Sequence, residues 1–403
     1  MSGGIVQLVA IGAQDAYLTG KPEVSFYRSS YKRYTHFANS VERQLIQGTP
    51  SAGGISTVRL EKKGDLLSYM YITARDTSGA LVPQLNWTSN VIDKVELLIG
   101  GQVIDTQDGY WMNQIEPVVG AMNGSQRFLP AGTATQPGNN FNSFQPLKFF
   151  FCKDWQSALP LVALQYHDVE IRITWSPTLN STVQIAGASN AGLTNTTYSQ
   201  LQYIVWTNFI YLDQGERDFF AKTAQDLLIT QVQRQIIPNA PLVELAFAHP
   251  VKYLAFQSNN YVQAYTLPGG NTSGPVLASQ LQFKTQVNGI DIGESRSLFQ
   301  WVDPNQYYHT PFGYAPYGQT ANVATIPFCL DTSKLQPTGT LNFSRIDTYR
   351  IVTPTTITLQ SIVQGASPIA STSVNASSGP FIYAVNYNIL RIQNGMGAVL
   401  YSS

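Results

Sequence analysis

Val41-Glu-Arg-Gln-Leu-Ile46 returns in the second half of the chain as Val232-Gln-Arg-Gln-Ile-Ile237, and Phe151-Cys-Lys-Asp154 returns as Phe328-Cys-Leu-Asp331. Shorter echoes keep the same order: Ile104-Asp105 with Ile290-Asp291, Ile115-Glu-Pro117 with Val302-Asp-Pro304, Arg172-Ile173 with Arg350-Ile351, and Asn208-Phe209 with Asn386-Tyr387. Chance similarity does not keep order over a whole chain. The repeat therefore predicts a duplicated domain.

The spacing between the copies changes slowly. It falls from 191 residues between Val41 and Val232 to 178 residues between Asn208 and Asn386. The largest drop lies before Phe151, where the first copy carries the Gly-, Asn- and Gln-rich run Ala131–Asn140. Surface loops accept insertions of this kind. We therefore expect two tandem folds of one type, each of about 180 residues.

Composition limits the class of protein. The 403 residues suffice for two buried cores. Only 12% of them are charged, against about 25% in typical proteins. The 24 basic and 24 acidic residues cancel to a net charge of zero, which favours association. An ordinary neutral β-rich protein would have the same composition, so this is only a weak indication of assembly.

Three further features bear on the compartment. Cys152 and Cys329 occupy matching positions in the two copies, so we expect each to fill a core site instead of pairing with the other. Apolar runs stay short of the roughly 20 residues that a membrane span needs. The start Met1-Ser-Gly-Gly4 lacks the basic leader of a secretory signal. We expect synthesis and folding in the cytoplasm.

The local pattern is that of β-strands separated by turns. Val169–Trp175 alternates apolar and polar residues, as a strand with one buried face does. Two hairpins are predicted at matching places, with turns at Gly100-Gly101 and Asn288-Gly289. With 31 Gly and 22 Pro in the chain, each half fits an all-β antiparallel sandwich or barrel.

Helical periodicity is confined to a few segments. The clearest runs from Gln214 to Gln231 and is predicted to be a helical linker between the copies. Shorter helices are predicted at Asp108–Glu116 and Ser295–Asp303, each after a hairpin. The repeat and the linker together predict an N-terminal arm over 1–24, a first domain over 25–212, a helical linker over 213–231 and a second domain over 232–403.

Residues with catalytic chemistry form no recognisable motif. The histidines are scattered, without metal-ligand spacing, at His36, His167, His249 and His309. Phosphate-loop, dinucleotide and nucleophile-elbow patterns are absent. The carboxylates Asp291 and Asp303 have acidic counterparts, Asp105 and Glu116, in the other copy, which favours a structural role. We therefore predict no catalytic, cofactor-binding or metal-binding residue, and no enzyme.

The segment Tyr27–Phe37 mixes aromatic residues with Arg28, Lys32 and Arg33. Alone it is typical of a nucleic-acid-binding arm. Phosphate binding rests on surplus positive charge, however, and this chain has none. We favour an arm whose tyrosines pack under the domains. Sequons for N-glycosylation occur at Asn86, Asn123, Asn180, Asn195, Asn271, Asn342 and Asn375, and a chain rich in Asn, Ser and Thr makes several by chance.

Several long blocks resemble the major capsid proteins of nucleocytoplasmic large DNA viruses, especially those of algal viruses. They are Gly12–Phe26, Tyr31–Ala38, Leu159–His167, Tyr211–Arg217, Gly339–Asp347 and Tyr383–Arg391. The resemblance implies two tandem eight-stranded antiparallel jelly rolls with a few short helices in loops and linker. It also implies a homotrimer that forms a pseudo-hexagonal capsomer in the icosahedral shell of the virion.

The resemblance also implies partners: neighbouring capsomers and minor capsid and penton proteins. It is compatible with an internal membrane beneath the shell. Two other classes of protein stay open at this point. One is a carbohydrate-active or carbohydrate-binding tandem β-sandwich protein, because paired jelly rolls also suit glycan clefts. The other is a nucleic-acid-binding virion protein that uses the arm, against which the zero net charge counts.

Overall fold

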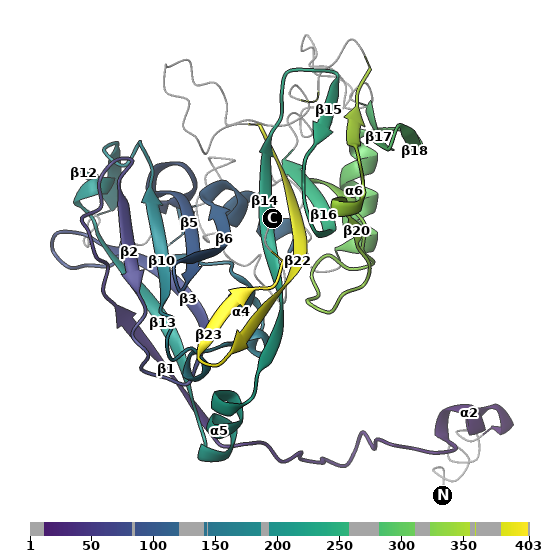
Figure 1. Cartoon of the computed structure of the whole chain (residues 1–403), viewed down its shortest axis with the longest axis horizontal. Coiled ribbons are helices and arrows are strands. Elements are labelled where there is room, and N and C mark those ends of the chain that lie inside the picture. The colour runs from purple at the N-terminus through teal and green to yellow at the C-terminus, as the bar shows by residue number, and fades with distance from the viewer. Residues whose placement is uncertain are drawn as a thin grey trace, which may run out of the picture. The chain divides into compact units, whose positions relative to one another are not determined.

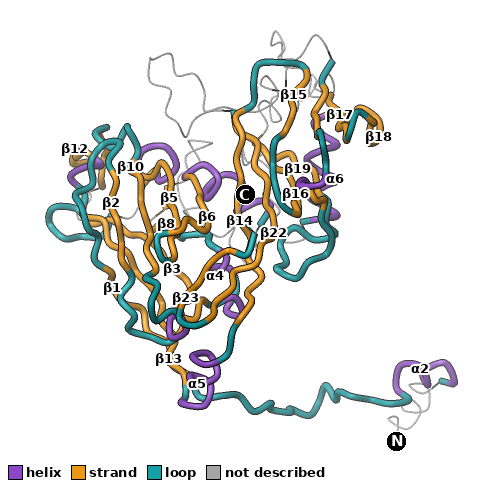
Figure 2. Tube along the Cα trace, in the orientation of Figure 1, coloured by secondary structure: helices purple, strands orange, loops and turns teal. Residues whose placement is uncertain are grey.

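The computed structural model describes residues 12–82, 85–120, 141–142, 144–186, 193–257, 282–310, 323–354, 359 and 380–401. The chain divides into two compact units, residues 1–37 and 38–403. In the first unit, the described part holds two short helices, η1 (Ala13–Asp15) and α2 (Ala16–Thr19), whose residues are mostly exposed. The second unit, here called the body, is built largely of strands (Figures 1 and 2).

The first half of the body forms two antiparallel sheets, whose main strands lie in the orders β1-β13-β3-β8 and β2-β10-β5-β6. Their bounds are β1 Phe37–Gln44, β2 Ile55–Arg59, β3 Leu66–Arg75, β5 Ile92–Ile99, β6 Gln102–Asp108, β8 Phe144–Pro146, β10 Val169–Trp175 and β13 Gln202–Leu212. The expected alternation in Val169–Trp175 is confirmed, because every second residue of β10 is buried.

The second half repeats this arrangement, with main strands in the orders β14-β22-β16-β19 and β15-β21-β17-β18. Their bounds are β14 Gln225–Ile236, β15 Leu242–Leu245, β16 Pro250–Gln257, β17 Gln282–Val287, β18 Ile290–Ser297, β19 Val323–Pro327, β21 Tyr349–Val352 and β22 Phe381–Gln393. The two strand orders correspond one to one.

The sequence echoes fall on corresponding strands. Arg172-Ile173 lies in β10, between β2 and β5, and Arg350-Ile351 lies in β21, between β15 and β17. Asn208-Phe209 lies in β13 and Asn386-Tyr387 in β22, each the second strand of its sheet. The fold is therefore the expected one: two tandem jelly rolls, each with eight main strands in two facing sheets.

Smaller elements complete the body. The remaining strands are β4 Leu85–Asn86, β7 Phe141–Asn142, β9 Leu159–Pro160, β11 Thr182–Ala186, β12 Leu193–Thr197, β20 Leu341–Asn342 and β23 Met396–Val399. The helices are η2 Trp87–Val91, η3 Trp111–Ile115, α3 Glu116–Val119, α4 Phe150–Lys153, η5 Trp155–Ser157, η6 Leu161–Ala163, η7 Tyr198–Gln200, α5 Gln214–Lys222, α6 Leu298–His309 and η9 Phe343–Arg345. The inserted run 131–140 lies outside the described residues.

Both predicted hairpins are present, as β5–β6 and β17–β18. Their turn residues have the positive φ angles of a type I′ turn, 58° and 83° at Gly100 and Gly101, and 50° and 81° at Asn288 and Gly289.

One sequence echo is misaligned in the hairpins. In the first hairpin, Asp105 pairs with Leu97. In the second hairpin, the residue at the same distance from the turn as Leu97 is Thr285, and Thr285 pairs with Ile292. The cause is a β-bulge that adds one residue to the first hairpin next to Leu97. Asp105 therefore corresponds in space to Ile292, and the expected match of Asp105 with Asp291 is wrong.

The predicted linker helix is shorter than expected. Helix α5 ends at Lys222, because Thr223 adopts an extended conformation with φ −90° and ψ 131°. Gln225–Ile236 then pairs with β22 along its whole length. The expectation of helix up to Gln231 is wrong, because the backbone hydrogen bonds of a twelve-residue strand outweigh a weak helical pattern.

The two short helices predicted after the hairpins are present but shifted. In the first copy η3 and α3 run from Trp111 to Val119, and in the second α6 runs from Leu298 to His309, past Pro304. Each follows directly on the last strand of its hairpin. These helices decide which surfaces of the body are covered.

Candidate assembly surfaces

The first jelly roll covers the outer face of a sheet of the second. Along β22, Ile382 and Ala384 belong to the core of the second jelly roll. Tyr383 and Val385, which alternate with them, belong instead to the core cluster of the first. Trp111 of η3 packs on Tyr383, with ring centroids 5.3 Å apart. Strand β22 is therefore buried on both faces from Phe381 to Asn388.

Asp108, at the end of β6, holds this internal interface together. Its carboxylate accepts hydrogen bonds from the Trp111 amide at 2.6 Å, from Arg234 at 2.9 Å and from the Tyr383 hydroxyl at 2.9 Å. Burial still raises the pKa of Asp108 above its ordinary value, against the opposing effect of these partners. The Arg234 guanidinium also lies 4.9 Å from the centre of the Phe381 ring.

Asp105 makes a second polar contact across the same interface. Its carboxylate accepts from the Val232 amide of β14 at 2.9 Å and from Gln107 at 2.7 Å. The residue is 4% exposed. Burial raises the pKa of Asp105 to about 6, although these hydrogen bonds act in the opposite direction.

Glu116, at the start of α3, is buried beside two lysines. Its carboxylate lies 2.8 Å from Lys148 and 3.7 Å from Lys153. Burial alone would raise the pKa of Glu116, but the two ammonium groups outweigh burial and hold the pKa below its ordinary value. The three side chains form a structural ion cluster.

Among the described residues, the corresponding sheet of the first jelly roll exposes side chains on its outer face. In β3, Met70 and Ile72 point into the core, while Tyr69 and Tyr71 point outward. Tyr71 contacts Phe144 edge-on at 5.5 Å and stacks against Trp206 at 6.5 Å between centroids. Tyr69 is 42% exposed. We call Tyr69, Tyr71, Phe144 and Trp206 the aromatic face.

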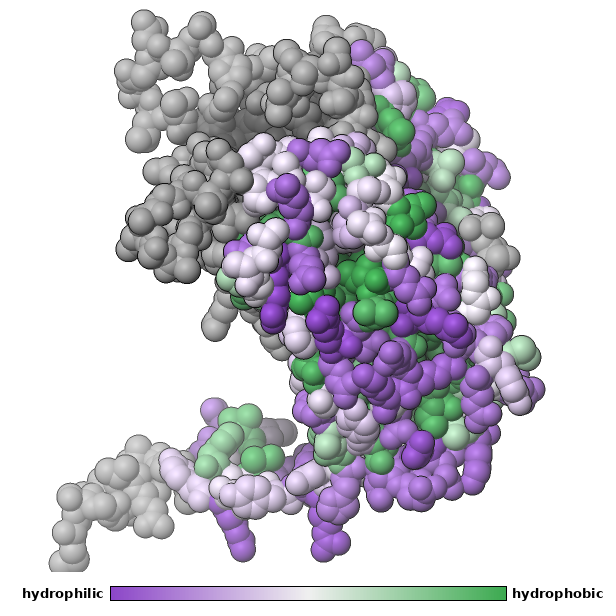
Figure 3. Space-filling model, turned by 90° about the vertical axis from the view of Figure 1, so that its left-hand side faces the viewer, coloured by the Kyte–Doolittle hydropathy of each residue, from purple (hydrophilic) through white to green (hydrophobic). Residues whose placement is uncertain are grey.

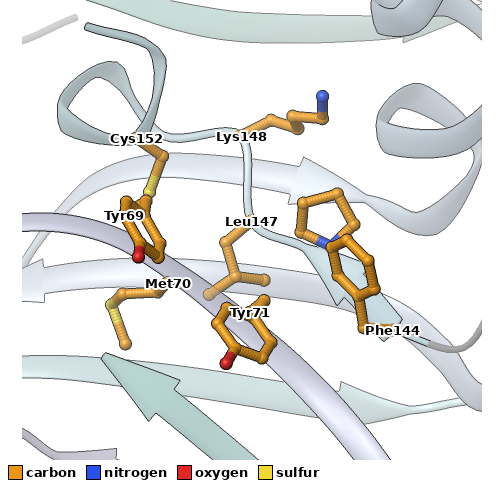
Figure 4. Close-up of a pocket in the computed structure, with 8 residues that line it drawn as sticks. Tyr69, Met70, Tyr71, Phe144, Leu147, Lys148 and Cys152 are labelled. Carbon is orange, nitrogen blue, oxygen red and sulfur yellow. The ribbon is translucent and has the colours of Figure 1, made fainter. Parts of the chain in front are cut away.

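A groove of about 480 Å³ lies on the aromatic face (Figure 4). Its lining consists of Tyr69, Tyr71 and Phe144 of the aromatic face together with Met70, Pro146, Leu147, Lys148 and Cys152. Burial raises the pKa of the Cys152 thiol to about 12, so the thiol is protonated at neutral pH. The groove is thus an aromatic recess without a nucleophile.

A second open surface belongs to the other jelly roll. Every residue of β18 from Ile290 to Arg296 is exposed, and Ile290 and Ile292 are 74% and 51% exposed. Near the end of the adjoining α6, Tyr307 and Tyr308 are 78% and 74% exposed. We call β18 and α6 together the β18–α6 flank.

Apolar side chains also form separate patches between polar ones on the face shown in Figure 3. Large exposed hydrophobic residues occur elsewhere on the body, for example Ile55 at 59% and Trp155 at 80%. Single exposed residues of this kind are normal. The aromatic face and the β18–α6 flank differ because each gathers several aromatic or aliphatic side chains on neighbouring elements.

The three histidines of the body each make a structural contact. His167 lies with Nδ1 3.0 Å from the Gly397 carbonyl, and His309 with Nδ1 2.9 Å from the Cys329 carbonyl. His249 has a positive φ of 67° and donates its amide to Ser344. Within the described ranges, no three His, Cys, Asp or Glu residues are grouped as metal ligands. That the chain carries no catalytic, cofactor or metal residue stays a prediction.

The remaining sequence-based candidates are placed as follows. Cys329 is buried, and Cys152 is half-buried at the groove, both as free thiols. Asp291 is exposed and pairs with Lys284 at 2.6 Å. In the arm, the side chains of Tyr27 and Tyr31 are exposed, and the expected packing of these tyrosines stays a prediction. Of the part of the chain described, no helix is both long and apolar enough to cross a membrane.

The sequence reasoning missed the aromatic face. Its signal is the alternation Tyr69-Met70-Tyr71-Ile72, in which a strand carries aromatic residues on the side away from its core. Only the pairing of β3 with β8 and β13 brings Phe144 and Trp206 to the same surface.

Comparison with known proteins identifies the class. Residues 25–213 match the family "Major capsid protein N-terminus", and residues 216–398 match "Large eukaryotic DNA virus major capsid protein". The chain is 31% identical to the major capsid protein of Pyramimonas orientalis virus and 31% identical to that of Paramecium bursaria Chlorella virus 1, over 100% of each chain. The chain belongs to the family of major capsid proteins of large eukaryotic DNA viruses.

Solved structures agree with this family. A quasi-atomic model of the PBCV-1 virus capsid superposes with a TM-score of 0.67 at 27% identity, covering 94% of this chain and 100% of that one. PBCV-1 VP54 gives a TM-score of 0.68 at 26% identity with the same coverage. The Faustovirus major capsid protein, at 14% identity and a TM-score of 0.56, shares the fold over 95% of this chain and 94% of its own.

The role of the chain follows from this membership. It is a structural protein of the virion, located in the capsid shell, where capsid proteins of this family assemble into capsomers. The expectation that it is no enzyme is confirmed by the family, whose members are structural. The alternative of a carbohydrate-active protein finds no support in the matched families, which are both capsid families.

Proposed function

We propose that three copies of this chain form a pseudo-hexagonal capsomer, and that such capsomers tile the icosahedral shell of a large double-stranded DNA virus. One observation carries the proposal: both halves of the chain contain the same two sheets with their main strands in the same order. Three such chains supply six similar units around a threefold axis, which is the number a hexagonal tile needs.

The proposed division of labour along the chain is an arm over 1–24, jelly rolls over 25–212 and 232–403, and a linker over 213–231. Helix α5 and the start of β14 occupy the linker. The two family matches, which end at 213 and begin at 216, support a boundary in this region.

The proposed partners are other copies of the chain, neighbouring capsomers, and minor capsid and penton proteins. Only 12% of the residues of the chain are charged. This low share supports contact with proteins, because uncharged polar groups cost less free energy than ions on dehydration. Direct nucleic-acid binding is not expected, since the net charge is zero.

Light scattering coupled to gel filtration tests the trimer. We expect a particle of three times the 44.4 kDa chain mass, stable on dilution, and a six-lobed outline in negative-stain images. A protein that stays monomeric at every concentration, or that binds glycans as a monomer, would contradict the proposal.

A further inference from the structure

We infer that the aromatic face of one copy receives the β18–α6 flank of the next copy, so that the chains join head to tail. This inference rests on the proposed trimer and names the surfaces that form it. The occupant of the groove is therefore a second copy of this chain.

A contact of this type already exists inside the chain. In the first jelly roll, β6, η3 and α3 lie against the outer face of the sheet β14-β22-β16-β19. The strand and helix that correspond to them in the second jelly roll are β18 and α6. The sheet that corresponds to the covered one is β1-β13-β3-β8. Its outer face carries the aromatic face, on which Tyr69 is 42% exposed.

Each chain thus has one docked pair of surfaces and one undocked pair of the same type. A repeat of the internal contact between chains would use both undocked surfaces. Because a head-to-tail contact joins two different surfaces, it closes into a ring when the rotation allows it. Tyr307 and Tyr308 lie on the helix that would approach the groove, since α3 in the first jelly roll contacts β19, the counterpart of β8.

The hairpin register gives the contact at single-residue level. Asp105 binds the Val232 amide inside the chain. Ile292 is the spatial counterpart of Asp105, and Val41 is the sequence counterpart of Val232. Ile292 of one copy therefore lies against Val41 of the next. Both side chains are exposed in the single chain, by 51% and 38%, and both are apolar, so their contact buries no charge.

Ile292→Glu tests the flank. A carboxylate at this position would be buried in the contact, so we expect the particle mass to fall about threefold, to that of the monomer, while the far-ultraviolet circular dichroism of the folded chain stays unchanged. Ile55→Glu is the matched control, because Ile55 is also exposed but lies in β2, at the sheet edge opposite β6. It should leave the trimer intact.

A disulfide tests the register. The double variant Val41→Cys/Ile292→Cys, in a Cys152→Ser background, should give linked dimers and trimers on a non-reducing gel after mild oxidation. Asp105→Cys/Val232→Cys is the positive control and should link within one chain. Ile55→Cys/Ile292→Cys should stay monomeric on the gel.

The outcomes separate the two proposals. If the unmodified protein is a monomer, the proposed trimer fails and this inference fails with it. If the protein is a trimer that survives Ile292→Glu and gives no linked species with Val41→Cys/Ile292→Cys, the trimer stands and the head-to-tail contact described here is overturned. Loss of the trimer in Ile292→Glu together with linkage in the double variant supports the contact.

Discussion

Strands β6 and β18 hold the same place in their sheets and have opposite surroundings. From Ile104 to Asp108, β6 is almost wholly buried, whereas β18 is exposed from Ile290 to Arg296. At the shared position, β6 has the carboxylate of Asp105 and β18 has the side chain of Ile292. The strand with the more polar residue is the buried one.

The difference shows what duplication permits. A contact inside one chain forms once, during folding, and can include buried acids whose hydrogen bonds fix its geometry. A contact between chains forms more easily if the residues at its centre carry no charge, as Ile292 does not. Two copies of one fold can therefore share a topology while their flanks follow different chemistry.

The largest expected effect concerns the covered contact. Trp111 is fully buried against Tyr383, so Trp111→Ala should lower the free energy of unfolding by about 4 kcal/mol, from lost burial and the cavity left behind. Urea unfolding followed by fluorescence measures the change. Trp155→Ala is the control, since Trp155 is 80% exposed, and it should shift the midpoint little. If the two substitutions lowered the free energy of unfolding by similar amounts, the packing of η3 on Tyr383 would contribute no more to stability than an exposed tryptophan does.

A smaller effect is expected at Asp105. Its pKa is raised to about 6 in the folded chain, from an ordinary 3.8. Between these two pKa values the folded state keeps a proton that the unfolded state has lost. The free energy of unfolding therefore falls as the pH rises from about 4 to 6, and above pH 6 it stays at the lower value. The pKa difference corresponds to about 3 kcal/mol.

Asp105→Asn cannot ionise and should be more stable than the unmodified chain by about 3 kcal/mol at pH 7.5, with the advantage vanishing near pH 3.5. Denaturant unfolding at both pH values measures it. Asp291→Asn, on the exposed β18, should show no such pH-dependent gain. Equal stability of Asp105→Asn and the unmodified chain at pH 7.5 would mean that the Asp105 carboxylate is well solvated in the folded protein.

The smallest expected effect is that of salt on the trimer. The contact proposed between copies is apolar at Val41 and Ile292, and exposed ion pairs contribute only about 0 to 1 kcal/mol each. Sedimentation in 1 M salt, where screening acts beyond about 3 Å, should give the same trimer as at low ionic strength. Dissociation in 1 M salt would show that ion pairs hold the copies together.

The fold could be predicted because local sequence patterns indicate its strands and turns, and these patterns occur twice. The hairpin turns at Gly100-Gly101 and Asn288-Gly289 and the alternation in Val169–Trp175 are signals of sequence alone. The strand register of Asp105 could not be predicted, because a β-bulge shifts the pairing of one hairpin by a residue and leaves no signal in its composition.

The assembly surfaces could be predicted only in part. Low charge indicated a protein that associates, but it did not locate the contacts. Phe144 and Trp206 are far from Tyr71 in the sequence and meet it only through strand pairing. Strand β14 occupies most of the segment in which helix was expected up to Gln231. Its pairing partner, β22, lies more than a hundred residues further along the chain, so local patterns could not indicate the pairing.

Helix α5 affects how the assembly of the shell depends on the concentration of the protein. By joining β13 to β14 it makes the first docking event intramolecular, with an effective concentration in the millimolar range for a short connection. That event does not depend on how much protein the cell contains. Only the head-to-tail contact obeys mass action, so the onset of assembly depends on the amount of chain synthesised. In the proposed assembly, folded subunits accumulate first, and rings form as the concentration of subunits rises, because each ring gathers three chains.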